Sequence, residues 1–265
     1  MPQFPIPSGK KVGEIVTLDP DDSKHLSTVL RMVRGEKLSL FDGKKRFAGE
    51  IVSAKKNRVT VHLLEEISSP VIKGEVTLCQ AMLKKDKMEW VIQKATELGA
   101  AHFIPFYSER TIPTGKNEAV LLRWQKIADE AVKQCGRVTP MMISSAVRFS
   151  ELMNRSEENP IKILFHQETV DFGLSEAGGE GRAPARPQRV RTGGRNPRQD
   201  PPNLDQNQQP KVFCFIGPEG GFSEKEIELA RQAGCEIASL GSLTLRAETA
   251  AVAALTLIQH ELGNI

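Results

Sequence analysis

The sequence has few cysteines and no closely spaced pair of them, which limits its metal and disulfide chemistry. The four cysteines, at positions 79, 135, 214 and 235, form no Cys-x-x-Cys pair. This spacing excludes a zinc ribbon and argues against a disulfide framework, so we expect a reducing, cytoplasmic setting. The five histidines are isolated from one another, and we expect them to be surface or core residues with no metal bound.

The sequence also lacks a long apolar run. No stretch approaches the roughly 18 residues that a membrane-spanning helix needs, so we expect none. The first ten residues contain several prolines and no apolar core, so no secretory signal is expected there. Apolar residues make up 39% and charged residues 26% of a 29.3 kDa chain of 265 residues. That composition is ordinary for one large or two modest domains.

The net charge is small, but the positive charge is concentrated in one segment. The formal charge is +3, and the six arginines from Arg182 to Arg198 have no acidic residue among them. Removing those six charges from +3 leaves −3 for the rest of the chain. Because glycine and proline separate the arginines, the segment cannot bury enough apolar surface to offset its conformational entropy. We predict a disordered surface loop over residues 173–210, either a tolerated insertion or an arm that contacts nucleic-acid phosphate.

The first 70 or so residues predict a small β domain. Short strands with turn signals at close spacing, such as Asp42-Gly43 and Lys55-Lys56-Asn57, are typical of a small barrel. A short helix is expected after Asp19, because acidic residues and an early proline favour a helix start. Ser68-Ser69-Pro70 is expected to be a linker. The expected strands are 13–18, 36–41, 47–54 and 58–64, and the helix extends to residue 32.

From residue 71 to the end, predicted strands and helices alternate, which indicates a mostly parallel sheet covered on both faces. Ser223 and Glu226 form a Ser-x-x-Glu capping box. The final helix is apolar almost all round from Ala250 to Ile258, as in a helix buried on several sides or shared with a partner subunit. The expected strands are 75–83, 103–107, 161–165, 211–216 and 236–240, and the expected helices are 87–98, 117–134, 223–233 and 247–262.

A glycine-rich turn over Gly217–Gly221 is the first candidate site. It follows an apolar strand and precedes the capped helix, and in open α/β sheets ligands bind beyond such strand ends. Its glycines do not make Gly-x-Gly-x-x-Gly, and no Gly-Lys-Ser/Thr follows, so neither a dinucleotide site nor a P-loop is supported. Glu219 would repel a polyphosphate and suits a ligand with hydroxyls, an amine or a cationic centre. The alternative is a purely structural turn.

A second turn, over residues 239–250, places Arg246 and Glu248 at the start of the final helix. Glu248 suits the positive end of the helix dipole. Arg246 opposes the same dipole, so we expect it to bind a substrate anion or the carboxylate of Glu219.

These two turns closely resemble the paired signature of the RsmE family. Its members are S-adenosylmethionine-dependent methyltransferases that modify N3 of a uridine in small-subunit (16S) ribosomal RNA, and they belong to the SPOUT class with a trefoil-knotted cofactor site. The resemblance implies a PUA-like β-barrel RNA-binding domain at residues 1–70, a SPOUT-like α/β methyltransferase domain at 71–265, and a homodimer. Further matches are His25-Leu26, Val29-Leu30-Arg31, Gly35, Lys94, Glu97-Leu98-Gly99, Arg110, Arg123-Trp124, Glu130-Ala131, Gln134-Cys135-Gly136-Arg137 and Pro140.

The resemblance also assigns site residues. The residues expected to bind S-adenosylmethionine are Phe165, His166, Ile216, Gly217, Pro218, Glu219, Gly220, Gly221, Leu240, Gly241, Leu243, Leu245, Arg246 and Ala250. The residues expected to contact 16S ribosomal RNA, free or in the small subunit, are Arg31, Lys94, Arg110, Arg123 and Arg137; a solvated charge or a salt bridge is the alternative for each.

The chain departs from the family pattern in three places. Gln3-Phe4 stands where Arg-Phe is usual, which weakens an RNA contact there. Thr244-Leu245-Arg246 replaces the commoner Ile-Leu-Arg, and the loop before Gly217 is longer than usual.

The reaction that the resemblance implies is an in-line transfer of a methyl group from a sulfonium to a ring nitrogen. The sulfonium is already cationic, so no metal is required. Uracil N3 must lose its proton, and the negative charge that spreads onto the flanking carbonyl oxygens suits a guanidinium. We expect Arg246 to supply it; Glu248 is a candidate general base, with a helix-dipole role as its alternative. A non-catalytic RNA-binding ribosome assembly factor, or a SPOUT enzyme acting on a ribose hydroxyl or a guanine, are the rival interpretations.

Overall fold

The computed structural model of this chain describes residues 3–69, 71–111, 118–154, 160–167 and 209–265. The predicted disordered loop over 173–210 lies outside the described residues except for its last two positions.

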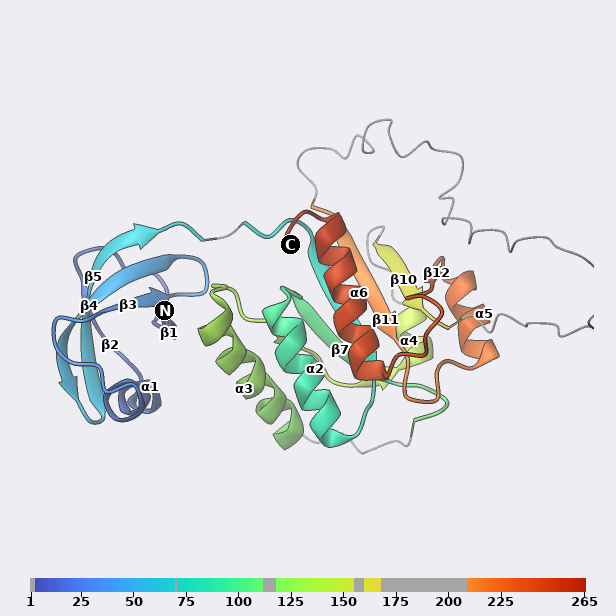
Figure 1. Cartoon of the computed structure of the whole chain (residues 1–265), viewed down its shortest axis with the longest axis horizontal. Coiled ribbons are helices and arrows are strands. Elements are labelled where there is room, and N and C mark those ends of the chain that lie inside the picture. Colours follow the sequence, from blue (N-terminus) through green and yellow to red (C-terminus); the bar gives the residue numbers. More distant parts are fainter. Residues whose placement is uncertain (1–2, 70, 112–117, 155–159, 168–208) are drawn as a thin grey trace, which may run out of the picture. The chain divides into compact units, whose positions relative to one another are not determined.

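The N-terminal residues form a five-stranded sheet in the order β1-β3-β4-β5-β2 (Figure 1). Alternate residues of β4 and β5 face one core, where Phe47, Ile51 and Val61 are almost fully buried. This confirms the predicted small β fold, and it adds β1, which the proline-rich start did not indicate. The bounds are β1 Gln3–Pro5, β2 Ile15–Thr17, β3 Lys37–Phe41, β4 Arg46–Lys55 and β5 Arg58–Ile67.

The turns and the short helix of this region follow from local hydrogen bonding. Asp42 accepts the backbone N–H groups of Lys44 and Lys45 at 2.9 and 2.7 Å, which closes the β3–β4 turn as predicted. Asp19 caps α1 (Pro20–Lys24), and one π-helical turn over His25–Val29 continues it. The helix therefore ends three residues before the predicted position 32.

The remaining residues form a second sheet, in the order β12-β10-β11-β6-β7-β8, with β9 paired to β7. All its pairings are parallel, as predicted. The strands are β6 Glu75–Ala81, β7 His102–Tyr107, β8 Met142–Ile143, β9 Val147–Arg148, β10 Ile161–Phe165, β11 Lys211–Ile216 and β12 Glu236–Ala238, and the helices are α2 Lys85–Glu97, α3 Glu118–Cys135, α4 Phe149–Met153, α5 Glu224–Gln232 and α6 Ala247–Glu261.

Helices cover both faces of this sheet (Figure 1). Along β11, Val212, Cys214 and Ile216 pack into the core with α2, α3 and α6. Phe213 and Phe215 point the other way, into the core with α4 and α5. Because successive side chains of a strand point to opposite faces, the near-continuous apolar run of β11 has two buried sides. Across the described segments, we find no helix with both the length and the hydropathy to cross a membrane.

Candidate functional site

The candidate site lies at the carboxyl ends of the parallel strands. Phe165 at the end of β10 is level with Ile216 of β11 and with Ala238 of β12, and Ile216 is level with Gln80 of β6. The segments that follow β10, β11 and β12 therefore emerge at one edge of the sheet. The structure thus brings to one edge the segments that the sequence analysis expects to bind a cofactor.

The glycine-rich turn is shaped by a close approach to an aromatic cluster. A Cβ atom on Gly217 would lie 3.1 Å from the ring of Phe222. That ring is buried and stacks on Phe106, with 6.2 Å between centroids and 8° between planes. Gly221 has a φ of +68°, a conformation that favours glycine. The Phe222 anchor and the two glycines fix the path of the turn and leave its outer backbone, at Glu219 and Gly220, exposed.

A buried carboxylate ties this turn to the loop after β7. Glu226, which is 4% exposed, accepts hydrogen bonds from the Ser223 N–H at 2.9 Å, the Ser108 hydroxyl at 3.0 Å and the Glu109 N–H at 3.1 Å. The predicted capping box is confirmed, since the Ser223 hydroxyl accepts from the Glu226 N–H in return. Arg110 adds a second link, because its guanidinium donates to the Gly220 carbonyl. Glu226 thus has a positioning role at this edge that the capping motif alone did not reveal.

Arg246 is the N-cap residue of α6, and its side chain makes no capping hydrogen bond. It is exposed at the edge where the strands end. Of the two partners expected for Arg246, a substrate anion or Glu219, the structure does not show the second, because the carboxylate of Glu219 lies 3.2 Å from the ammonium of Lys87. The Arg246 guanidinium is near enough to Glu248 to help lower the pKa of that carboxyl, and it remains exposed to an anionic ligand.

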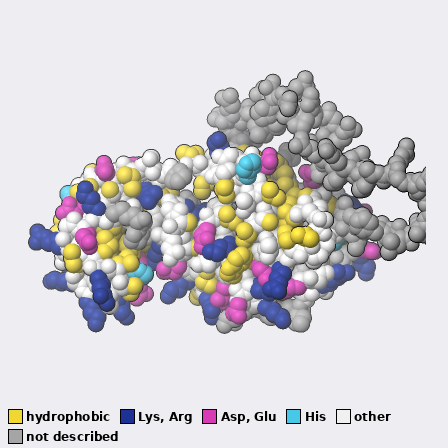
Figure 2. Space-filling model, in the orientation of Figure 1, with side chains coloured by type: hydrophobic (Ala, Val, Ile, Leu, Met, Phe, Trp, Pro, Cys, Tyr) yellow, Lys and Arg dark blue, Asp and Glu magenta, His cyan; other side chains and the backbone are white. Residues whose placement is uncertain are grey.

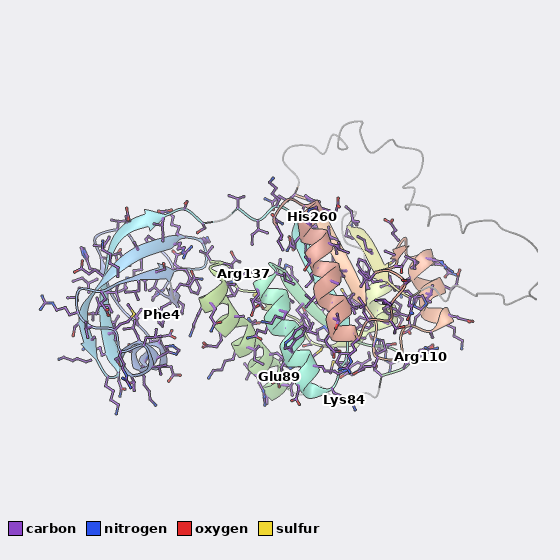
Figure 3. The ribbon with its side chains drawn as sticks, in the orientation of Figure 1. Phe4, Lys84, Glu89, Arg110, Arg137 and His260 are labelled. Atoms are coloured by element: carbon purple, nitrogen blue, oxygen red, sulfur yellow. The ribbon has the colours of Figure 1, made fainter. Side chains whose placement is uncertain are left out.

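Lys87 is the residue of this site that our sequence interpretation missed. It lies in the first turn of α2, and its ammonium is 3.2 Å from Glu219 and 3.3 Å from Glu248. The signal that would have found it is the one used for Arg246: a cation in the first turn of a helix opposes the helix dipole and so has another purpose. Figure 3 shows Lys84, the N-cap of α2, at the same end of the sheet as Arg110, and His260 at the opposite end.

The ionisation of the Glu219–Lys87–Glu248 cluster follows from these contacts. The hydrogen bond to Glu219 is the largest cause that raises the pKa of Lys87. For Glu248, burial raises the pKa, but its own backbone N–H and the Lys87 ammonium outweigh burial and lower it. Glu248 and Lys87 are therefore both charged at neutral pH. A carboxylate with a lowered pKa is a weak base, which argues against Glu248 as the general base.

Gln80 is a fully buried amide beneath the glycine-rich turn. Its Nε2 donates to the carbonyls of Ala81 at 3.2 Å and Gly217 at 3.4 Å. Its Oε1 is buried with no hydrogen-bond donor in the part of the chain that the structure describes. A buried acceptor without a donor is unfavourable, so a donor from a ligand would stabilise it.

The loop between β12 and α6 completes the edge. Gly241 has a φ of +112°, and the amide of Gln167 donates to the Thr244 hydroxyl at 2.8 Å, which links the loop to the end of β10. Leu240 and Leu245 are half-buried, whereas Leu243 is 78% exposed. Leu243 is therefore an exposed apolar side chain at the edge of the sheet where the segments expected to bind the cofactor meet.

The five residues predicted to contact RNA fall into three groups. Arg31, with a φ of +55°, and Arg110 are exposed. Lys94 pairs with Glu97 at 2.9 Å and Arg123 with Glu89 at 2.8 Å, so the salt-bridge alternative holds for both in this structure. Arg137, the fifth of these residues, is buried, although we expected it on the surface in contact with RNA.

Arg137 is only 9% exposed, and its guanidinium donates to the carbonyls of Thr96 at 3.0 Å and Ala100 at 2.7 Å. It satisfies carbonyls at the end of α2, which need partners outside the helix. This is a correction to the prediction: Arg137 (Figure 3) stabilises the fold and is not available to RNA. Gln3 is similar, since its amide donates to the carbonyls of Val132 and Arg137 at 2.7 and 2.6 Å.

Comparison with known proteins gives consistent matches over almost the whole chain. The family described as RNA methyltransferase domain matches residues 70–183 and 189–259, and the RNA methyltransferase PUA domain matches residues 18–64. Ribosomal RNA small subunit methyltransferase E of Aquifex aeolicus is 29% identical over 96% of this chain and 97% of its own length. The protein of the same name from Synechocystis is 30% identical, with 92% and 72% covered.

Solved structures agree with these relatives. Ribosomal RNA small subunit methyltransferase E from Neisseria gonorrhoeae, bound to S-adenosyl methionine, has a TM-score of 0.78 at 28% identity, with 98% of both chains covered. A putative methyltransferase from Legionella pneumophila, in complex with the same cofactor, has a TM-score of 0.76 at 30% identity, with 98% of this chain and 97% of that chain covered.

Proposed function

This chain belongs to the RNA methyltransferase family, with the ribosomal RNA small subunit methyltransferases E as its relatives, and from that premise we propose that it transfers the methyl group of S-adenosylmethionine to N3 of a uridine in 16S ribosomal RNA. The observation that carries the proposal is the meeting of the Gly217–Gly221 turn and the start of α6 at the carboxyl edge of one parallel sheet. Ligands of open α/β sheets bind at such an edge. We place the reaction in the cytoplasm.

S-adenosylmethionine fits the residues at this edge. The cofactor is cationic at sulfur and at its amino group, and Glu219 and Glu248 offer two carboxylates with one ammonium between them. Gln80 offers a buried acceptor that needs a donor. When bound, the cofactor supplies the electrophilic methyl group. We propose as its further contacts Phe165, His166, Ile216, Gly217, Pro218, Gly220, Gly221, Leu240, Gly241, Leu243, Leu245 and Ala250.

The chain's own residues then act on the uracil. Arg246 is exposed at the edge without a capping bond, so its guanidinium can donate two hydrogen bonds to one of the carbonyl oxygens beside N3. That oxygen gains negative charge when N3 gives its proton to solvent water, and the N3 lone pair then attacks the methyl group. Glu248 is better suited to hold charge than to accept a proton, given its lowered pKa. Arg110, held by the Gly220 carbonyl, links the RNA-facing loop after β7 to the turn.

Two measurements test the function. Titration calorimetry with S-adenosylmethionine is expected to show one site per chain, and mass spectrometry of small-subunit RNA treated with enzyme and cofactor is expected to show a methyl group on N3 of one uridine. No binding of S-adenosylmethionine in the calorimeter would contradict the proposal and favour a non-catalytic RNA-binding assembly factor. A methyl group on a ribose hydroxyl or on a guanine would instead show that the enzyme acts on a different target, and it would contradict the proposal that uracil N3 is methylated.

The N-terminal sheet supports the RNA part of the proposal. A cavity of about 370 Å³ lies beside the β3–β4 turn. It is lined by Lys44 and Lys45 of the turn, by Arg46 at the start of β4, and by residues 66–69. Glu66 pairs with Lys45 at 2.8 Å, and Arg46 keeps a buried Nε without an acceptor in the described residues. A phosphate would supply one. We propose that this surface and Arg31 contact the RNA backbone, and that the domain boundary lies near residue 70.

Affinity for the RNA is expected to fall steeply with salt, because each neutralised phosphate releases counterions. Replacing Lys44 by methionine is expected to reduce the slope of log affinity against log salt by roughly 0.7–0.9, the contribution of one phosphate contact. Filter binding over a salt series measures this slope. Lys56→Met, in the turn at the other end of β4, is the matched control and should leave the slope unchanged. Equal slopes for both variants would remove the Lys44 surface from the interface.

We further propose that the chain forms a homodimer through α6 and its surroundings. Leu257 of α6 is 53% exposed and Trp90 of α2 is 42% exposed, although the rest of α6 is largely buried. Figure 2 shows hydrophobic side chains gathered on the face that carries these helices. Analytical ultracentrifugation is expected to give twice the chain mass, and Leu257→Lys to give monomers; a monomeric wild type would contradict this. The trefoil knot stays a prediction from the resemblance.

A further inference from the structure

Lys87 joins three elements of the candidate site. It lies in the first turn of α2, Glu219 in the glycine-rich turn after β11, and Glu248 in the first turn of α6. Its ammonium is 3.2 Å from one carboxylate and 3.3 Å from the other. These partners are far apart in the sequence, so the contact exists only because the strand ends meet.

The local sequence does not favour a cation at this position. The N-terminal end of α2 is the positive end of its dipole, and its N-cap, Lys84, provides no side-chain hydrogen bond. The two ion pairs are therefore what stabilises the Lys87 charge. In return, the ammonium separates two carboxylates that would otherwise repel each other at short range. Glu248, 16% exposed, and Lys87, 31% exposed, are partly shielded from water, whereas the Glu219 side chain is 43% exposed.

We infer that Lys87 is a positioning residue of the cofactor site, which holds the Glu219 turn against the start of α6 so that both carboxylates face the incoming cation. This inference rests on the proposed function, because it takes S-adenosylmethionine as the ligand. Loss of Lys87 leaves two negative charges that repel each other, so the Glu219 side chain turns away from the start of α6. The pocket then binds its ligand less tightly, although every group that touches the ligand is still present.

A direct contact with RNA phosphate is the alternative role for a partly exposed lysine such as Lys87, and the two roles predict different effects. A positioning residue changes the affinity for the cofactor and leaves the affinity for RNA alone. A phosphate contact changes the affinity for RNA and reduces its salt dependence.

The test uses the full-length protein with Lys87→Met and Lys87→Arg. For Lys87→Met, we expect calorimetry to give a Kd for S-adenosylmethionine about tenfold higher and kinetics to give a similar rise in KM for it. The KM for RNA should stay within about twofold. Lys87→Arg should recover most of the affinity, because a guanidinium reaches both carboxylates. Lys10→Met is the matched control, since Lys10 pairs with Glu14 at 3.1 Å in the loop between β1 and β2.

Rescue by the conservative variant separates positioning from simple packing. Lys87→Arg keeps a positive charge between Glu219 and Glu248, whereas Lys87→Met keeps much of the side-chain volume without the charge, so only Lys87→Met should raise the cofactor Kd. Thermal melting of each variant verifies that it folds. The inference is overturned if Lys87→Met binds the cofactor as the wild type does, if only its RNA affinity changes, or if Lys87→Arg binds the cofactor as weakly as Lys87→Met. A wild type that binds no S-adenosylmethionine overturns the proposed function and this inference with it.

Discussion

Replacing Arg246 by alanine is expected to lower kcat for methyl transfer by about 100- to 1000-fold, the usual effect of removing one donor to a developing anion. The side chain is exposed and has no capping bond, so the free energy of unfolding should change by less than about 0.5 kcal/mol. The Kd for S-adenosylmethionine should change far less than kcat, because the guanidinium acts on the uracil anion formed during the reaction. Single-turnover kinetics with radiolabelled cofactor, together with calorimetry, measure both quantities.

Two further variants show whether the loss of turnover is specific to the guanidinium of Arg246. Arg231→Ala removes an exposed arginine from α5, 59% exposed and 3.9 Å from Glu228, and should leave turnover unchanged. Arg246→Lys keeps the charge but cannot form the paired hydrogen bonds, so it should recover only a small part of the rate. Undiminished turnover by Arg246→Ala would remove this residue from the mechanism. A raised cofactor Kd with normal kcat would assign it to cofactor binding alone.

Replacing Glu226 by alanine is expected to have the largest effect on stability. Its carboxylate is 4% exposed and accepts from Ser108, Glu109 and Ser223, so its removal strands three donors at a buried position. A hydrogen bond to a charged acceptor contributes about 1.5–3 kcal/mol. Because the three donors can find other partners or water when the carboxylate is removed, we expect the free energy of unfolding to fall by about 3 kcal/mol in total. For a chain of this size, that loss lowers Tm by roughly 6–12 °C. Differential scanning calorimetry measures it.

The same substitution should also weaken cofactor binding, because Glu226 holds the glycine-rich turn to the loop after β7. Glu224→Ala is the control: this residue shares the first turn of α5 but is exposed, so its loss should cost only a small helix-dipole contribution of about 0.3–1 kcal/mol. Glu226→Gln keeps one carbonyl acceptor and should fall between the two. If Glu226→Ala melts within about 2 °C of Glu224→Ala, the three hydrogen bonds do not carry the stability assigned to them.

The elements of this protein were predictable because their signals are local. The Ser223–Glu226 capping box, the Asp42-Gly43 turn and the apolar strand over residues 211–216 each depend on residues that are neighbours in the sequence, and all three are confirmed. The helix after Asp19 began as predicted and ended early, since nothing local marks its end. Strand β1 was missed because its pairing with β3, 36 residues away at Gln3 and Ser39, is what makes it a strand.

The partners of the charged side chains were not predictable in the same way. The sequence identified Glu219, Arg246 and Glu248 as candidate site residues, and it offered Arg246 two partners, a substrate anion or Glu219. The structure pairs Glu219 with Lys87, 132 positions away. It also buries Arg137 against the carbonyls of Thr96 in α2 and of Ala100 after it, although an arginine that follows a helix looks like a surface cation in the sequence. Long charged side chains choose partners by distance in space, and that distance depends on how strands of different segments align.

The sequence by itself indicated most of the strands and helices, the two glycine-containing turns and the resemblance to the family, because periodicity, caps and turn residues act over a few positions. It did not indicate the short elements β1, β8, β9 and α4. Only the tertiary structure decided which charges meet at the carboxyl edge: Lys87 between two glutamates, Glu226 beneath the turn, and Arg246 near Glu248. The reason is the register of β10, β11, β12 and β6, which places segments far apart in the chain within hydrogen-bonding distance.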